Sequence, residues 1–178
     1  MLQESSLDSI NIADIARQAG VTRSAFYFYF ENKAAAVAAL TQEMYAEAFA
    51  ATDVLLGTGT PAERIEGTIR GLFAAWDRHE SLYRAMLEAR ATNPVVREMW
   101  EADRQSFVEP VAGMIRAERD GGRAPDGPDA SVLAAVLLEL NDRMLERLAA
   151  GGPHPRDDLV AAVVAVWLRS IYGRTDEK

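Results

Sequence analysis

The sequence predicts an all-α protein, and three observations carry that prediction. Apolar residues recur at helical spacing along nearly the whole chain, strand-like alternation is scarce, and glycine and proline lie between the periodic stretches. The chain has 178 residues, of which 49% are hydrophobic and 26% are charged. It is therefore long and apolar enough to bury a core, which excludes a disordered chain.

Two short helices across a tight turn are expected first. Asn11 is placed to cap a helix whose first turn holds Asp14. Gly20 closes the following turn, and Thr22 caps a second helix that runs through Phe28. This order predicts a helix-turn-helix, in which the second helix can enter the major groove of DNA.

Longer helices follow. One is expected from Asn32-Lys33 to Leu56, before the breaker Gly57-Thr58-Gly59. Thr60-Pro61-Ala62-Glu63 combines an N-cap, a first-turn proline and a capping-box glutamate, so it starts the next helix. The remaining helices are expected over residues 81–90, from Pro94 to about Arg119, and over residues 129–149 and 156–172.

The last two expected helices carry alanine, valine and leucine on more than one face. A helix that packs against the protein on just one side has a single apolar stripe. We therefore predict that residues 129–149 and 156–172 form both a face of the helical bundle and the interface of a homodimer.

The composition excludes several kinds of site. The chain has no cysteine, and its two histidines, His79 and His154, lie far apart, so neither a metal site nor a cofactor is expected. Phosphate-loop and nucleophile-elbow motifs are absent from the sequence, and no enzyme activity is expected. The longest apolar run is about half of a membrane span, which predicts a cytoplasmic protein without membrane contact.

The formal net charge of −8 argues against a general nucleic-acid coat protein, because phosphate binding needs local cations. Residues 1–33 contain three basic and four acidic residues, so most of the negative charge lies in the rest of the chain. This distribution is compatible with a small DNA-reading element on an acidic body.

The expected recognition helix offers side chains suited to DNA. Arg23 suits guanine or phosphate, the Ala25 methyl group suits thymine, and Lys33 suits phosphate. The predicted DNA-contacting residues are Thr22, Arg23, Ser24, Ala25, Tyr27, Tyr29 and Lys33. Phe26 and Phe30 are expected to pack inside, because their spacing of four places them on one helix face.

These residues resemble the DNA-binding signature of TetR-family repressors. The matching residues are Ile15-Ala16-Arg17-Gln18-Ala19-Gly20-Val21-Thr22, Phe26 to Phe30 and Lys33. Glu88 to Thr92, Ala117 to Asp120, Leu140 to Arg143 and Trp167 to Gly173 extend the likeness to the EthR-like branch, over about residues 1–173. The resemblance implies a nine-helix, Ω-shaped homodimer that has an N-terminal DNA-binding domain and dimerises through its last two helices.

In that family a full helix precedes the helix-turn-helix, whereas Met1-Leu2 would here be only its tail. The resemblance implies a DNA-binding domain over residues 1–45, with its first helix largely missing, and a ligand-binding and dimerisation domain over residues 46–178. Either the DNA-binding domain lacks a wall of its core, or the sequence is a fragment of a longer chain.

The resemblance also implies an elongated apolar cavity in the core. The residues expected to line it are Trp76, Met86, Trp100, Phe107, Met114, Leu137, Leu138, Asn141, Leu145 and Trp167. Asn141 matches a position where the branch presents an amide to the ligand, and Leu138 replaces a second asparagine. These residue types favour an uncharged, mostly apolar ligand. The alternative for Asn141 is a buried amide bound to a neighbouring backbone group.

Two functions follow from this reading. The first is a dimeric repressor that binds a palindromic operator with recognition helices roughly 34–36 Å apart, and that a small apolar ligand releases. The second is a helical small-molecule-binding dimer without operator affinity, which a missing first helix would allow. An electrophoretic shift with DNA from upstream of the protein's own gene separates the two.

Overall fold

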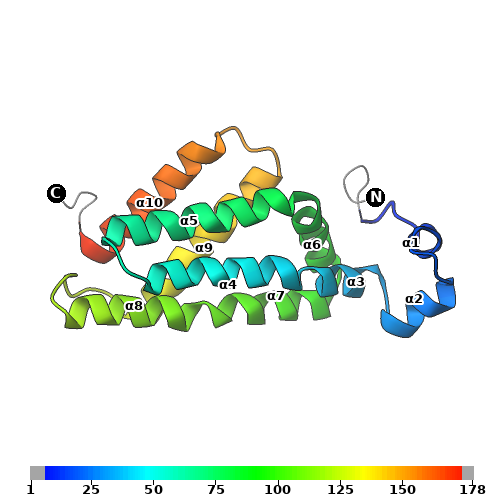
Figure 1. The fold of residues 1–178 in the computed structure, drawn as a ribbon, viewed down its shortest axis with the longest axis horizontal. Coiled ribbons are helices and arrows are strands. Elements are labelled where there is room, and N and C mark those ends of the chain that lie inside the picture. The colour runs from blue at the N-terminus through cyan, green and yellow to red at the C-terminus, as the bar shows by residue number, and fades with distance from the viewer. Residues whose placement is uncertain (1–6, 174–178) are drawn as a thin grey trace.

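The structure, a computed structural model, describes residues 7–173 apart from the side chains of residues 42 and 43. In that part of the chain every regular element is an α-helix, so the all-α prediction is confirmed (Figure 1). The expected remnant of a helix at Met1-Leu2 lies outside the described residues. The helices are α1 (Ile12–Gln18), α2 (Arg23–Tyr29), α3 (Lys33–Leu40), α4 (Gln42–Leu56), α5 (Pro61–Arg78), α6 (Glu80–Thr92), α7 (Pro94–Ser106), α8 (Val108–Asp120), α9 (Ala130–Ala149) and α10 (Arg156–Tyr172).

Helices α1 and α2 form the expected helix-turn-helix at one end of the molecule, joined to the rest through α3 (Figure 1). The Asn11 side chain accepts a hydrogen bond from the Ala13 N–H, and that of Thr22 accepts one from the Ala25 N–H. Gly20, between the two helices, has a φ of 68°, a left-handed conformation that side chains disfavour. The predicted caps and turn are therefore present.

The helix expected from Lys33 to Leu56 is interrupted at Thr41, so that prediction is wrong in its length. The buried Thr41 hydroxyl donates to the Ala38 carbonyl at 2.7 Å, and the Thr41 N–H donates to the Val37 and Ala38 carbonyls. These bonds tighten and end the last turn of α3, and α4 starts at the next residue.

The helix expected from Pro94 to Arg119 is also two helices, and it divides at Phe107. Pro110 lies three residues beyond the division and has no N–H to donate to the Ser106 carbonyl, so a continuous helix would lose a bond there. The Phe107 N–H donates to the Arg104 carbonyl instead, a tighter turn that closes α7. The proline was the sequence signal for this division.

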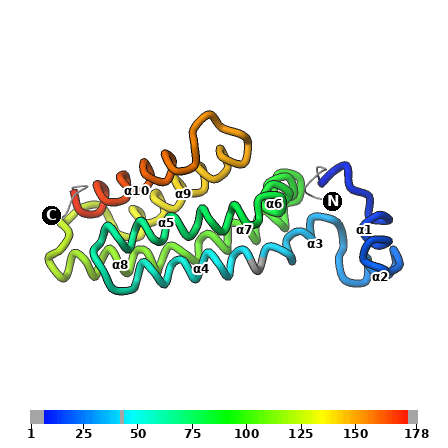
Figure 2. Tube along the Cα trace, turned by 45° about the horizontal axis from the view of Figure 1, so that its top comes forward, coloured from blue at the N-terminus to red at the C-terminus, as the bar shows by residue number. Residues whose placement is uncertain are grey.

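The larger part of the molecule is a bundle in which α4 and α5 run antiparallel and pack tightly (Figures 1 and 2). A Cβ atom at Gly71 would lie 3.1 Å from the Ala51 Cβ, so this glycine permits the close approach. The capping box of Thr60 and Glu63 begins α5 as expected. Helices α7 and α8 follow one another along α4, while α9 packs on α8 and α10 on α5 and α9.

The last two helices keep apolar side chains on the surface of the protomer. Val132 and Val136 on α9 are each 59% exposed, and Val166 on α10 is 43% exposed. Other faces of both helices carry core residues such as Leu137 and Trp167. Of the helices described, none is long and apolar enough to cross a membrane.

Candidate functional site

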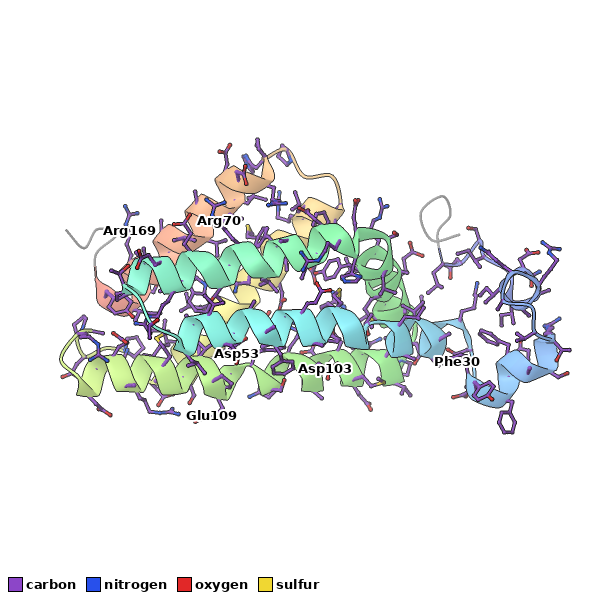
Figure 3. The ribbon with its side chains drawn as sticks, in the orientation of Figure 1. Phe30, Asp53, Arg70, Asp103, Glu109 and Arg169 are labelled. Carbon is purple, nitrogen blue, oxygen red and sulfur yellow. The ribbon has the colours of Figure 1, made fainter. Side chains whose placement is uncertain are left out.

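Most of the predicted DNA-contacting side chains on and next to α2 are accessible. Thr22, Arg23, Ser24, Tyr27 and Tyr29 are exposed, and Ala25 is half-buried. Phe26 is buried and its ring centroid lies 5.5 Å from that of Phe30, which Figure 3 shows at the junction of α2 and α3. Phe26 therefore packs inward as expected, whereas Phe30 is half-buried against it.

Arg23 is partly ordered by its neighbour Tyr27. The guanidinium carbon lies 5.6 Å from the centre of the Tyr27 ring, and one nitrogen donates to the Tyr27 hydroxyl at 3.4 Å. The contact is exposed and therefore weak, so the guanidinium is free to turn toward a base or phosphate. Phe28 was not among the predicted DNA-contacting residues, although its side chain is 83% exposed beside Tyr29.

Lys33 has a different environment from the other predicted DNA-contacting residues. Its ammonium donates to the backbone carbonyls of Leu7, Asp8 and Ile10 at 2.7, 3.0 and 2.9 Å. An ammonium has three hydrogens, so these bonds use its full donor capacity. Lys33 thus ties the segment that precedes α1 to the start of α3, a role that the sequence did not reveal.

The same segment is tied to the helical bundle. The Leu7 N–H donates to the Glu88 carboxylate of α6 at 2.8 Å, and the Leu7 side chain is buried in the main core. Helix α3 packs on α6 as well. The helix-turn-helix is therefore attached to the bundle through both α3 and α6.

A cavity lies between the helices of the bundle and is lined mainly by α4, α5, α7 and α9. The volume of the cavity is about 90 Å³, which is room for more than one water molecule. Its lining residues are Met44, Tyr45, Ala48, Ala51, Thr52, Leu55, Thr68, Leu72, Ala75, Trp76, Tyr83, Trp100, Arg104, Phe107, Val111, Leu138, Asn141, Asp142, Leu145 and Trp167.

Of the residues predicted to line a cavity, seven do so: Trp76, Trp100, Phe107, Leu138, Asn141, Leu145 and Trp167. The prediction is wrong for Met86, Met114 and Leu137, which are buried in the surrounding core. Leu137 directly precedes Leu138 on α9, so its side chain points about 100° away from that of Leu138 around the helix axis. The Met114 sulfur accepts a hydrogen bond from the Tyr172 hydroxyl, away from the cavity lining.

Asn141 is a buried amide that also lines the cavity. The residue is only 3% exposed. Its side-chain oxygen accepts a hydrogen bond from the Trp167 indole N–H at 3.0 Å, so its partner is a side chain rather than a neighbouring backbone group. The bond fixes the orientation of the amide at the cavity wall.

Charged residues on the cavity wall were not predicted. The Arg104 guanidinium on α7 lies 2.5 Å from the Asp142 carboxylate and 2.6 Å from that of Glu139, both on α9. Burial raises the pKa of the Asp142 carboxyl to about 6, more than the neighbouring Arg104 lowers it. The pairing brings together residues more than thirty positions apart, so no local spacing signalled it.

Two tyrosines of the wall were also missed. Burial raises the pKa of Tyr45, and the negative charges of Asp103 and Asp142 raise it further by smaller amounts. Burial also raises the pKa of Tyr83, with smaller contributions from Asp142 and Glu146. Both hydroxyls therefore keep their protons. A sequence signal existed for Tyr45, because Tyr45, Ala48, Thr52 and Leu55 recur at helical spacing on α4.

Comparison with known families matches both parts of the chain. Residues 1–40 match the family described as bacterial regulatory proteins of the tetR family, and residues 65–173 match the C-terminal domain of the transcriptional regulator EthR. The chain is 33% identical over 178 residues to the HTH-type transcriptional regulator EthR of Mycobacterium tuberculosis H37Rv, covering 97% of this chain and 82% of the relative. It is 32% identical over 177 residues to the regulator of the same name from Mycolicibacterium smegmatis, with the same coverage.

Solved structures agree with the fold. The TetR-family regulator PfmR from Thermus thermophilus superposes with a TM-score of 0.73 at 18% identity, covering 96% of this chain and 93% of that one. A putative TetR-family regulator from Rhodococcus sp. gives a TM-score of 0.72 at 14% identity, with coverages of 93% and 89%. With the helix-turn-helix and the family matches to both parts, this chain belongs to the TetR family of transcriptional regulators and has a C-terminal domain of the EthR type.

Proposed function

We propose that the chain is a dimeric transcriptional repressor that binds a palindromic operator and releases it when a small, mostly apolar ligand fills the cavity. The observation that carries the proposal is the position of α4. This helix contributes six residues to the cavity lining and follows α3, which leads directly from the helix-turn-helix. The relatives named as HTH-type transcriptional regulators support the same function.

The path from cavity to DNA passes through two helices. Tyr45 places α4 at the cavity wall, and Tyr83 does the same for α6. Helix α6 also holds the segment before α1 through Glu88 and Leu7. A ligand that displaces α4 and α6 moves the helix-turn-helix, and in a dimer it changes the spacing of roughly 34–36 Å between recognition helices that successive major grooves require.

The first experiment measures DNA binding by the full chain, using DNA from upstream of its own gene and random DNA of equal length. We expect Arg23→Ala to weaken operator binding by about 1–3 kcal/mol, because a bidentate contact with guanine is lost, and to affect random DNA less. Arg84→Ala, which removes an exposed arginine of α6, is the control and should bind as the wild type does. Absence of any operator shift would favour the alternative, a ligand-binding dimer without operator affinity.

A second variant tests the link between cavity and DNA without a known ligand. Leu138→Trp adds volume at the cavity wall and should lower operator affinity by mimicking occupancy. Circular dichroism and thermal unfolding verify that the variant is folded. A folded Leu138→Trp protein that binds operator with wild-type affinity contradicts the proposed release mechanism.

A further inference from the structure

The helix-turn-helix has a small core of its own. Ile10, Ala16 and Phe26 are buried, yet none of the three belongs to the main core of the bundle. Among residues 7–32, Leu7 alone belongs to that main core. Helices α1 and α2 pack chiefly against each other, and Figure 1 shows them projecting from one end of the bundle. Their orientation on the bundle therefore depends on few attachments.

The first attachment is the chain between α2 and α3. Residues 30–32 form this connection, and the backbone is extended at Phe30 and at Asn32. The Asn32 side chain accepts from the Ala35 N–H and so fixes the start of α3. A few residues between helices can absorb large changes in φ and ψ, so this connection limits the distance between α2 and α3 more than their orientation.

The second attachment is Leu7, which is held at three points. Its N–H donates to the Glu88 carboxylate of α6 at 2.8 Å, its carbonyl accepts from the Lys33 ammonium at 2.7 Å, and its side chain packs in the main core. Each of the two hydrogen bonds has a charged partner, and such bonds are stronger than those between neutral groups. We call this arrangement of Leu7, Lys33 and Glu88 the Leu7 anchor.

The two charged residues of the Leu7 anchor do not have the same role. Lys33 directly follows residues 30–32, so its bonds join the segment before α1 to the chain just after α2 and can move together with the helix-turn-helix. Glu88 lies on α6, which packs on α3 and belongs to the bundle. The bond from Glu88 to Leu7 therefore relates the helix-turn-helix to the bundle itself.

We propose that Glu88 is a positioning residue for operator recognition, which acts through the Leu7 anchor by fixing the orientation of the helix-turn-helix on the bundle. Loss of its bond to Leu7 leaves every predicted DNA-contacting side chain in the protein but lets the helix-turn-helix turn about residues 30–32. The two recognition helices of a dimer then no longer keep the spacing that successive major grooves require. The operator part of this inference rests on the proposed function, whereas the orientation part does not.

The first experiment measures the orientation without DNA. The sequence has no cysteine, so Gln18→Cys on α1 and Asp53→Cys on α4 create unique sites for two nitroxide spin labels. Both residues are exposed, and Figure 3 shows Asp53 on α4, away from the helix-turn-helix. Pulsed electron paramagnetic resonance in an excess of unlabelled protein gives the distance between the labels within one chain. We expect a narrow distance distribution with Glu88 present and a broader or shifted one after Glu88→Ala.

Matched variants separate the hydrogen bond from other effects. Glu88→Gln keeps an oxygen that accepts from the Leu7 N–H, so it should retain the narrow distribution. Glu80→Ala removes an exposed carboxylate of the same helix and should retain it as well. If circular dichroism shows that Glu88→Ala does not fold, Glu88→Leu, which keeps more of the side-chain volume, takes its place. An unchanged distribution in the folded variant overturns the proposal.

The second experiment measures binding of the unlabelled chain to operator and to random DNA of equal length. We expect Glu88→Ala to lower operator affinity about fivefold or more, because the correct orientation is no longer fixed before binding. Binding to random DNA at low salt should stay within about twofold, since attraction to phosphates does not depend on the spacing of half-sites. Glu88→Gln should restore most of the operator affinity. Equal losses on both DNAs, or wild-type operator affinity in Glu88→Ala, overturn the positioning role.

The two experiments together separate this inference from the proposed function. If the wild type binds no operator, the proposed function and the role of Glu88 in operator recognition are both wrong, and the distance distributions still decide whether Glu88 fixes the orientation. If the wild type binds operator but Glu88→Ala changes neither the distances nor the affinity, the inference is wrong and the proposed function stands.

Discussion

Lys33 is a basic residue in a position that suits a phosphate contact, yet its ammonium is hydrogen-bonded to backbone carbonyls of the protein. Its three hydrogen bonds to the carbonyls before α1 are charge-assisted, and such bonds are stronger than those between neutral groups. The side chain of Arg17, by comparison, is 80% exposed and pairs with Asp14 within α1. The structural role of Lys33 therefore has to be separated from any contact with DNA.

We expect Lys33→Met to lower the free energy of unfolding by about 2 kcal/mol, because three carbonyls lose a charged donor. Amide hydrogen exchange of residues 7–10 should accelerate in the same variant. The control Arg17→Met should change the free energy of unfolding by less than about 0.5 kcal/mol and leave the exchange of residues 7–10 unaltered. Urea denaturation and exchange mass spectrometry measure these effects. If Lys33 acts only on phosphate, its replacement leaves stability intact and instead lowers the salt slope of DNA binding by about one.

At the scale of helices, a buried carboxylate holds the far end of the bundle together. Glu118 of α8 is 3% exposed and accepts from Arg64 of α5 at 2.9 Å and from Arg123 of the following loop at 3.0 Å. Burial raises the pKa of Glu118, but the hydrogen bonds and charges of Arg123 and Arg64 outweigh burial and hold it below its ordinary value. The cluster fixes where α5 meets α8.

We expect Glu118→Gln to destabilise the protein by about 3 kcal/mol at pH 7, because two arginines lose their buried counter-charge. Since the folded-state pKa is lowered, this stabilisation is complete above the unfolded pKa, near 4.5, and is lost as the pH falls through the folded pKa. The difference between wild type and variant should thus shrink below pH 4.5 in urea denaturation.

The control for this prediction is Glu109→Gln on the same helix. Glu109 lies at the outer edge of α8, and its ion pair with Arg116 is exposed (Figure 3). Its replacement should change stability by less than about 0.5 kcal/mol. Equal effects of the two substitutions would show that Glu118 contributes no more than a surface charge.

At the scale of the whole molecule, the exposed valines of α9 and α10 fit the predicted dimer interface. Val132 and Val136 lie one helical turn apart on α9, and Val166 adds to the apolar surface of α10. Exposed apolar area of this kind is what subunit association removes from water. A homodimer through α9 and α10 would place two helix-turn-helix units on one assembly, as the proposed repressor requires.

We expect the double variant Val132→Glu, Val136→Glu to be monomeric at micromolar concentration by multi-angle light scattering, because dimerisation would bury two carboxylates of each protomer without partners. Operator affinity should fall with it, since only a dimer spans two half-sites. Val95→Glu changes a valine of α7 that is 61% exposed and should leave the oligomeric state unaltered. A dimer that survives both glutamates places the interface elsewhere.

The features that the sequence determined by itself are local. The caps at Asn11, Thr22 and Thr60 depend on a side chain and a backbone N–H two or three residues away, so spacing alone predicts them. The inward packing of Phe26 follows from helical periodicity in the same way. The division of the helix before Pro110 was equally local, and the missing proline N–H would have predicted it.

The tertiary structure alone decided which helix faces meet. Met86, Met114 and Leu137 are as apolar as the residues that line the cavity, and only the rotation and packing of their helices keep them out of it. The hydroxyls of Tyr45 and Tyr83 have no hydrogen-bond partner among the described residues, and the carbonyls that Lys33 binds lie more than twenty residues before it. Contacts at such separations depend on the packing of the whole bundle, whereas a cap or a helical stripe is complete within a few residues.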